Sequence, residues 1–242
     1  MKYLSKSLFL LVVSVVICCG LYPLVLWGIG QVFLPFQANG SMLKGPDGQL
    51  VGSKLIAQPF TKDEYFQPRP SAASYDASAS ASSALAASNP ALRSRVAQQL
   101  GPIVKYKSGP KAGQLVAPDV IAYFQEKNPG KAPAADTAAT YFDTWRQAHP
   151  DADLQEVPGD MVTTSASGLD PHISLQNAEF QLDRVAGKWA ADLKRDPAAI
   201  RAEVDQILLQ NASAPWGGLI GDKFINVLEV NLALRTQYGA PQ

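Results

Sequence analysis

The sequence predicts an α+β protein with a single N-terminal transmembrane helix followed by one extracytoplasmic mixed α+β domain. Three observations lead to this fold class. No charged residue lies between Lys6 and Lys44, so the apolar run exceeds the roughly 20 residues that span a bilayer. Apolar residues recur at helical spacing from Leu175 onward, and short apolar runs bounded by turn residues indicate strands elsewhere.

The apolar segment is predicted to be a retained membrane anchor over residues 8–34, after a cytoplasmic N-terminus of residues 1–7. Lys2 and Lys6 precede the anchor and no basic residue lies within it, which favours a cytoplasmic N-terminus. The rival interpretation is a cleaved signal peptide, but the stretch is long for one and no A-x-A-like cleavage site follows. Residues 35–242 then form the extracytoplasmic domain.

Small residues in the anchor, Ser14 and Gly20, predict close packing against partner helices. Pro23 is expected to kink or end the inner helical segment. Cys18 and Cys19 are the only cysteines and both lie in the anchor. The exported domain therefore has no disulfide and must be stabilised by its own core.

Charge gives no indication of a nucleic-acid partner. Lysine plus arginine and aspartate plus glutamate both number 21, and a basic surface is the usual signature of nucleic-acid binding. Partners must therefore be recognised by shape and specific contacts.

Short extended pieces follow the anchor. Turn residues flank Val51 and the pair Leu55–Ile56, which suggests strands at both places. Between Ala72 and Ser88, 14 of 17 residues are Ala or Ser, which is typical of an exposed low-complexity loop. Asn89 followed by Pro90 predicts an N-cap and the first position of a helix.

Residues 109–151 are predicted to be a lineage-type insert. Pro, Gly and Ala divide it into two short aromatic helices, which carry Tyr123–Phe124 and Tyr141–Phe142 with Trp145. The last third is more regular. It predicts an amphipathic helix capped by Ser174, a second helix from Asp196–Pro197, and a strand around residues 224–227 that runs into a final helix.

The stretch TTSASGLDPHIS, residues 163–174, contains residue types found in active sites. A serine hydrolase could use Ser165 with Asp170 and His172, but there is no G-x-S-x-G motif. A metal site would need more ligands than Asp170 and His172, and no HExxH or CxxC pattern supplies them. A rigid loop that leads into a helix explains more of the residues, so we predict no catalytic residue and no metal ligand.

The same loop and a proline-bounded arginine are candidates for docking partner subunits. A guanidinium between Pro68 and Pro70 loses little conformational freedom on binding, and interface energy concentrates in aromatic and arginine side chains. The predicted docking residues are Tyr65, Phe66, Arg69, Gly168, Asp170 and His172.

Six segments of the chain carry a resemblance to a known family, the C subunit of the Kdp-type potassium-transporting P-type ATPase. They are YPLVLWGIGQVFLPFQANGSM, GSKLIAQPF, YFQPRPSAASYD, SNPAL, VPGDMVTTSASGLDPHIS and INVLEVNLAL. The chain departs from the family pattern at Ser80–Ala84, where the family usually has Ser-Gly-Gly-Ser-Asn. The insert at residues 109–151 also lengthens a family connection.

The resemblance implies a non-catalytic accessory subunit of an ATP-driven, high-affinity potassium uptake complex in the bacterial cytoplasmic membrane. Such a subunit assembles and stabilises a channel-like potassium-translocating subunit and a P-type ATPase subunit. The resemblance also implies that the phosphorylated residue is on another chain, since no Asp-Lys-Thr-Gly motif occurs here. A role for ATP is implied only by the resemblance, because the family has been proposed to aid nucleotide binding. From the residues themselves we expect no bound cofactor.

Two other classes of protein stay open at this point. One is a membrane-tethered exported hydrolase or metal-binding module that uses Ser165, Asp170 and His172. The other is a freely secreted binding protein, which requires removal of the N-terminal segment.

Overall fold

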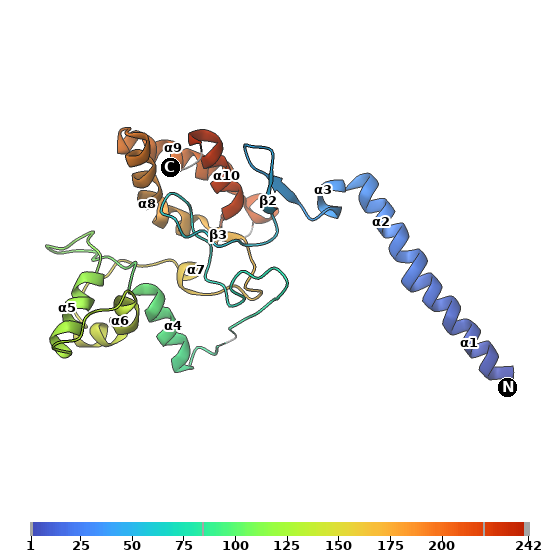
Figure 1. The fold of residues 1–242 in the computed structure, drawn as a ribbon, viewed down its shortest axis with the longest axis horizontal. Coiled ribbons are helices and arrows are strands. Elements are labelled where there is room, and N and C mark those ends of the chain that lie inside the picture. The colour runs from blue at the N-terminus through green and yellow to red at the C-terminus, as the bar shows by residue number, and fades with distance from the viewer. Residues whose placement is uncertain (1, 84, 220, 240–242) are drawn as a thin grey trace. The chain divides into compact units, whose positions relative to one another are not determined.

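The computed structural model describes residues 2–83, 85–219 and 221–239. It consists of two compact units, Met1–Leu55 and Ile56–Gln242 (Figure 1). Helices dominate both units, and the described residues of each form one two-stranded antiparallel sheet. The predicted α+β class with an N-terminal apolar helix is confirmed.

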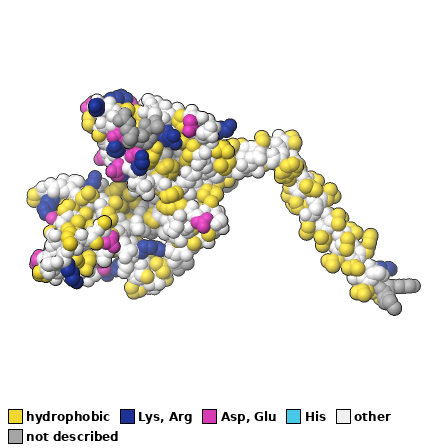
Figure 2. All heavy atoms as spheres, in the orientation of Figure 1, with side chains coloured by type: hydrophobic (Ala, Val, Ile, Leu, Met, Phe, Trp, Pro, Cys, Tyr) yellow, Lys and Arg dark blue, Asp and Glu magenta, His cyan; other side chains and the backbone are white. Residues whose placement is uncertain are grey.

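The first unit begins with a continuous helical rod. It comprises α1 (Lys2–Val15), a π-helical turn η1 (Val16–Leu21) and α2 (Tyr22–Phe33). Among the described residues, the stretch Tyr3–Phe33 is long and apolar enough to cross a membrane, and its most apolar part is not buried within the protein. Figure 2 shows apolar side chains along the rod. A helix that is apolar on all sides requires an apolar solvent, which a bilayer supplies.

Pro23 does not end this helix. The π-helical turn η1 lies directly before α2, and the N–H of Tyr22 at its end donates to the carbonyl of Ile17, five residues earlier. A π-turn changes the helical hydrogen-bond register locally. Pro23, which has no N–H to donate, lies at the second position of α2, directly after this change of register.

A short helix and a hairpin complete the first unit: α3 (Pro35–Ala38), β1 (Met42–Lys44) and β2 (Leu50–Ser53). The predicted strand at Val51 is therefore confirmed. The predicted strand at Leu55–Ile56 is wrong, because the chain turns there after the Lys54 N–H donates to the Ser41 carbonyl (2.9 Å). A strand requires backbone hydrogen bonds to a neighbouring strand, and the pair Leu55–Ile56 has no such neighbour among the described residues.

The second unit contains ten helices and strands among its described residues. They are α4 (Pro90–Leu100), α5 (Ala117–Lys127), α6 (Thr137–Ala148), α7 (Gly159–Val162), β3 (His172–Ser174), α8 (Leu175–Leu193), α9 (Pro197–Asn211), η2 (Pro215–Gly218), β4 (Phe224–Asn226) and α10 (Val227–Tyr238).

The larger hydrophobic core of this unit lies among α8, α9, α10 and the β3–β4 sheet. Trp189 of α8 is buried and donates from Nε1 to the carbonyl of Glu64 (2.9 Å). The predicted helix starts are confirmed by their caps. The Ser174 hydroxyl accepts from the N–H of Asn177 (3.1 Å), and Asp196 caps α9 in the same way.

A second, smaller core is formed by α4, α5, α6 and the segments that follow them. Both predicted aromatic helices of the insert are present as α5 and α6. The Trp145 ring lies between those of Phe142 and His149, with centroid distances of 6.1 and 4.8 Å. At the end of α4, Gly101 packs directly on the backbone of Ala138 at the start of α6.

Candidate functional site

The loop that precedes β3 is shaped by Gly168. Its φ is +72°, a left-handed conformation that glycine adopts without strain. A Cβ atom at this position would lie 2.7 Å from the carbonyl oxygen of Ala81 and 3.0 Å from the backbone nitrogen of Ala73. Gly168 is therefore required for the close approach of two chain segments.

The Ala- and Ser-rich segment is bound to this loop. The N–H of Ala81 donates to the carbonyl of Ser167 (3.0 Å), and the hydroxyls of Ser83 and Thr164 lie 2.8 Å apart. The backbone contact forms although the family's glycines are missing from this stretch. Ala84, the last residue of the stretch that departs from the family pattern, lies outside the described residues.

Asp170 and His172 form a hydrogen-bonded pair. The Asp170 Oδ1 lies 2.9 Å from His172 Nδ1 and 3.0 Å from the backbone nitrogen of His172. The hydrogen bond with the His172 side chain holds the pKa of the Asp170 carboxyl below its usual value, although partial burial opposes this shift. The His172 ring also meets Phe224 of β4 edge to face, with a centroid distance of 4.9 Å. These contacts fix the orientation of the imidazole.

The Asp170 carboxylate is expected to make the stability of the fold depend on acid. Because its pKa is lower in the folded chain, the stabilisation is complete above the unfolded pKa of about 3.9 and is lost as the pH falls through the lower folded pKa. We expect Asp170→Asn to lower the thermal unfolding midpoint at about pH 6, with a smaller difference at about pH 2.5.

Circular dichroism of the full chain in detergent at both pH values measures this effect. Asp151→Asn, at an exposed aspartate of the insert, is the control and should change neither midpoint. An equal loss at both pH values for Asp170→Asn would contradict the assignment.

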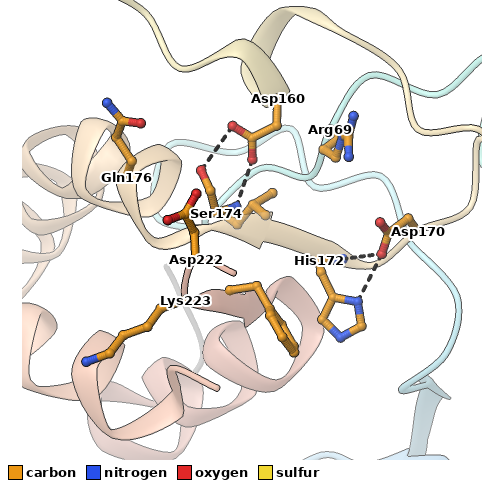
Figure 3. Close-up of a pocket in the computed structure, with 10 residues that line it drawn as sticks. Arg69, Asp160, Asp170, His172, Ser174, Gln176, Asp222 and Lys223 are labelled. Carbon is orange, nitrogen blue, oxygen red and sulfur yellow. Dashed lines mark hydrogen bonds and ion pairs between the residues drawn. The ribbon is translucent and has the colours of Figure 1, made fainter. Parts of the chain in front are cut away.

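A pocket of about 520 Å³ opens beside β3 (Figure 3). Its lining contains His172 and the charged residues Arg69, Asp160, Asp170, Asp222 and Lys223. The Asp160 carboxylate accepts from the backbone N–H of Ser174 (2.7 Å) and from its hydroxyl (3.1 Å). The pocket thus presents both signs of charge.

Arg69 reaches this pocket from a segment distant in sequence. Its Nη2 donates to the carbonyl of Thr164 (3.2 Å) in the loop, while its carbonyl accepts from the Tyr75 hydroxyl (2.9 Å). The buried Nε of Arg69 has no hydrogen-bond partner among the described residues. The positive charge of Arg69 also helps to lower the pKa of the Asp170 carboxyl.

The described contacts do not assemble a hydrolytic triad. Ser165 is buried, and its hydroxyl lies 3.5 Å from the backbone nitrogen of Asp170. No hydrogen bond between Ser165 and His172 is present among the described residues. A nucleophile needs its base within about 2.6–3.2 Å, so the geometry does not favour the hydrolase interpretation. Among the described residues, no three His, Cys, Asp or Glu side chains are placed so that they could hold a metal ion together.

Three of the six predicted docking residues, Tyr65, Phe66 and Gly168, do not line the pocket. Phe66 is 0% exposed and is part of the larger core, so its interpretation as a docking residue is corrected. Its aromatic ring packs in the larger hydrophobic core instead. Tyr65 is half-buried and packs against Phe60 at a centroid distance of 5.4 Å. Burial raises the pKa of the Tyr65 hydroxyl.

The predicted packing residues of the anchor lie in three successive parts of the rod: Ser14 in α1, Gly20 in η1 and Pro23 in α2. No heavy atom would lie within 4 Å of a Cβ at Gly20. The packing of this position against a partner helix stays a prediction.

Asp160, Asp222, Lys223 and Phe224 are members of the pocket that the sequence did not indicate. Asp160 lies in the one-turn helix α7, and Phe224 reaches His172 only because β4 pairs with β3. The available signal was the acidic residue in the segment VPGDM, which the family resemblance includes. The hydrogen bonds from Ser174 to the Asp160 carboxylate form only in the folded chain, because the two residues are 14 positions apart.

The comparison with known families bears on the whole chain. A family model described as K+-transporting ATPase, c chain, matches residues 4–123 and 121–236. The chain belongs to the KdpC family. A Potassium-transporting ATPase KdpC subunit of Xanthomonas campestris pv. campestris (strain B100) is 37% identical over 238 residues, which is 98% of this chain and 89% of that relative.

Two other relatives of the KdpC family, with the same description, show similar agreement. The protein of Caulobacter vibrioides (strain NA1000 / CB15N) is 38% identical over 219 residues, 90% of this chain and 84% of its own. The protein of Photorhabdus laumondii subsp. laumondii is 35% identical over 237 residues, 97% of this chain and 96% of its own. The likeness therefore extends through both compact units.

Proposed function

We propose that this chain is the non-catalytic accessory subunit of an ATP-driven potassium uptake complex, and that it assembles and stabilises the channel-like and ATPase subunits. The observation that carries the proposal is membership of the KdpC family over nearly the whole chain. The single apolar rod fits a subunit that is held in the membrane beside other spans. The phosphorylated residue belongs to the ATPase subunit, since this sequence lacks an Asp-Lys-Thr-Gly motif.

The proposed location is the bacterial inner membrane, with the N-terminus in the cytoplasm. Lys2 and Lys6 precede the apolar run, and the next basic residue is Lys44. Basic residues are retained on the cytoplasmic side. The second compact unit then lies outside the cytoplasm and meets the outer surfaces of its partner subunits.

The docking site in this proposal is the pocket that contains Arg69, Asp170 and His172. Hydrogen bonds to Thr164 and within the Asp170–His172 pair hold these side chains before a partner arrives. Ordered side chains lose little conformational entropy on binding. Because the pocket carries both signs of charge, it suits a polar loop of a partner subunit better than an apolar helix.

The pocket is not proposed to bind ATP. Asp160, Asp170 and Asp222 place three carboxylates around it, and like charges would repel a triphosphate. Any aid to nucleotide binding by this subunit would therefore act through its contacts with the ATPase subunit.

Arg69→Ala and His172→Ala are expected to reduce recovery of the partner subunits when the tagged full-length chain is purified in mild detergent. Each change removes a side chain that the pocket presents, and truncation of a hot-spot side chain in an interface costs about 2 kcal/mol or more. The measurement is the amount of each co-purifying subunit per tagged chain, together with the thermal unfolding midpoint of the isolated chain.

Arg93→Ala and His149→Ala are the matched controls. Both residues are exposed and lie outside the pocket, in α4 and at the end of α6. Recovery should fall for the two pocket variants and stay unchanged for the controls. If all four variants recover the partners equally, this pocket is not the docking site.

A further inference from the structure

The end of the apolar rod is tied to the segment that follows it. The Nδ2 of Asn39 donates to Oε1 of Gln31 in α2 (3.2 Å) and to the carbonyl of Pro35 (2.7 Å). A Cβ atom added to Gly30 would lie only 3.5 Å from the Cβ of Ala38. Helix α3 therefore packs against the last turns of α2, as Figure 1 shows.

The hairpin is in turn tied to this segment at both of its ends. Strand β1 begins directly after Ser41, and the Ser53 hydroxyl at the end of β2 donates to the carbonyl of Gly40 (2.7 Å). The N–H of Lys54 donates to the carbonyl of Ser41 (2.9 Å). The hairpin cannot move far from Phe33, the last residue of the apolar rod.

One face of this hairpin carries long exposed side chains. Met42 and Lys44 alternate with Leu43 along β1 and share one face. Lys44 pairs with Leu50 after a register shift of the ladder between Leu43 and Lys44, and directly paired residues face the same side. Met42 is 39% exposed and Leu50 is 63% exposed. Leu43, on the opposite face, is half-buried. The open face thus combines two apolar side chains with one lysine.

We propose that the face formed by Met42, Lys44 and Leu50 lies in the headgroup layer of the bilayer in which the rod is anchored. Apolar side chains together with lysine are typical of surfaces that bind at this level. The lysine stem lies along apolar surface while its ammonium group reaches lipid phosphates. The occupant of this face is therefore a lipid surface, and the hairpin is a second membrane contact of the chain.

The backbone of the hairpin explains why it stops at the headgroup layer. A two-stranded sheet leaves unpaired N–H and carbonyl groups along its edges, and these cannot enter the hydrocarbon core. The connecting turn is polar: Asp47 accepts from the N–H of Gln49 (3.2 Å). Only the tips of Met42 and Leu50 reach toward the acyl chains.

Apolar surface continues from the rod to the hairpin. Leu34 is 54% exposed and Phe36 of α3 is 45% exposed. An aromatic side chain at this level is typical of the membrane interface. A lipid surface that already surrounds the end of α2 can therefore extend over α3 to the hairpin.

The test places a nitroxide label at position 50 of the full-length chain, using Leu50→Cys in a background with Cys18→Ala and Cys19→Ala. The chain is reconstituted in vesicles of phosphatidylcholine and phosphatidylglycerol. Paramagnetic resonance then compares the access of oxygen, which enters lipid, with that of a water-soluble nickel chelate. We expect the oxygen-to-nickel ratio at position 50 to be several-fold higher than for Asp47→Cys in the polar turn.

Met42→Cys provides a second label on the same face and should behave like Leu50→Cys. Ser14→Cys within the rod reports whether the anchor itself has inserted, so a displaced hairpin is distinguished from a failed anchor. With the anchor inserted, equal ratios at positions 47 and 50 would overturn the proposal. Loss of access to both reagents at position 50 in the assembled complex would assign the face to a protein and would also overturn it.

Discussion

Asn231→Ala is expected to destabilise the second compact unit by about 2–6 kcal/mol, because it leaves two buried backbone groups without partners at about 1–3 kcal/mol each. Asn231 Oδ1 accepts from the N–H of Phe66 (2.9 Å), and its Nδ2 donates to the carbonyl of the same residue (2.9 Å). Both residues are almost fully buried, so water cannot replace these bonds. The side-chain amide of Asn231 thus pairs with both backbone groups of Phe66, as a neighbouring strand would.

Thermal or urea unfolding of the full chain, followed by circular dichroism, measures this loss against a stability that is typically 5–15 kcal/mol. Asn211→Ala is the matched control. Its amide makes one hydrogen bond, to the carbonyl of Ile207 (2.8 Å), at a half-buried position, so a loss of about 1 kcal/mol is expected. Equal destabilisation by the two substitutions would contradict the role assigned to Asn231.

Gly101→Ala is the second change with a large expected effect. A Cβ atom at this position would lie 2.3 Å from the carbonyl oxygen of Ala138 and 2.9 Å from the Cα of Ala139. Both are backbone atoms, so no side chain can rotate away. Overpacking costs about 1–3 kcal/mol and sometimes more. We expect α4 and α6 to be forced apart and the smaller core to lose stability at the upper end of that range.

Gly187→Ala gives a control of opposite sign. Gly187 lies within α8, and a Cβ there would meet no heavy atom within 4 Å. Alanine stabilises a helix by up to about 1 kcal/mol relative to glycine. Gly101→Ala should lower the unfolding midpoint and speed limited proteolysis of the insert. Gly187→Ala should raise the midpoint and should not speed this proteolysis. A stable Gly101→Ala protein with an unchanged protease pattern would contradict the predicted clash.

The helices of the second unit were predictable because their signals are local. Ser174, Asp196 and Asn89 each accept a hydrogen bond at a helix start, and the periodicity from Leu175 continues through α8. The short β4 strand before the final helix was also recognised. In each case the residues that decide the structure lie within a few positions of one another.

The misjudged features depend on distant partners. From its Pro-rich surroundings Phe66 was expected to be exposed. Its backbone is instead bonded to the side chain of Asn231, and its ring lies in the larger core. The Ala- and Ser-rich segment is mostly exposed and has no helix or strand among its described residues, as predicted, but its backbone contact with Ser167 could not be read from the sequence. The pocket likewise gathers residues from four separate stretches: Arg69, Asp160, residues 170–176 and residues 222–224. Without a partner strand, the apolar pair Leu55–Ile56 did not form one.

The β3–β4 sheet shows how its outer strand edges are occupied. The Pro171 carbonyl and the Leu175 N–H bond to the neighbouring strand, so the N–H groups of His172 and Ser174 point outward. Carboxylates cover both groups: Asp170 accepts from His172, and Asp160 accepts from Ser174.

On the other side, Phe224 exchanges two hydrogen bonds with Ser213 (2.9 Å each). A foreign strand that approached either edge would have to displace an existing contact, and at β3 it would meet negative charge. Exposed edges of this kind otherwise serve as templates for aggregation. The carboxylates of Asp160 and Asp170 therefore also hinder intermolecular β-pairing at the edge of β3. A subunit that docks at this pocket must be recognised through side chains and not by adding a strand.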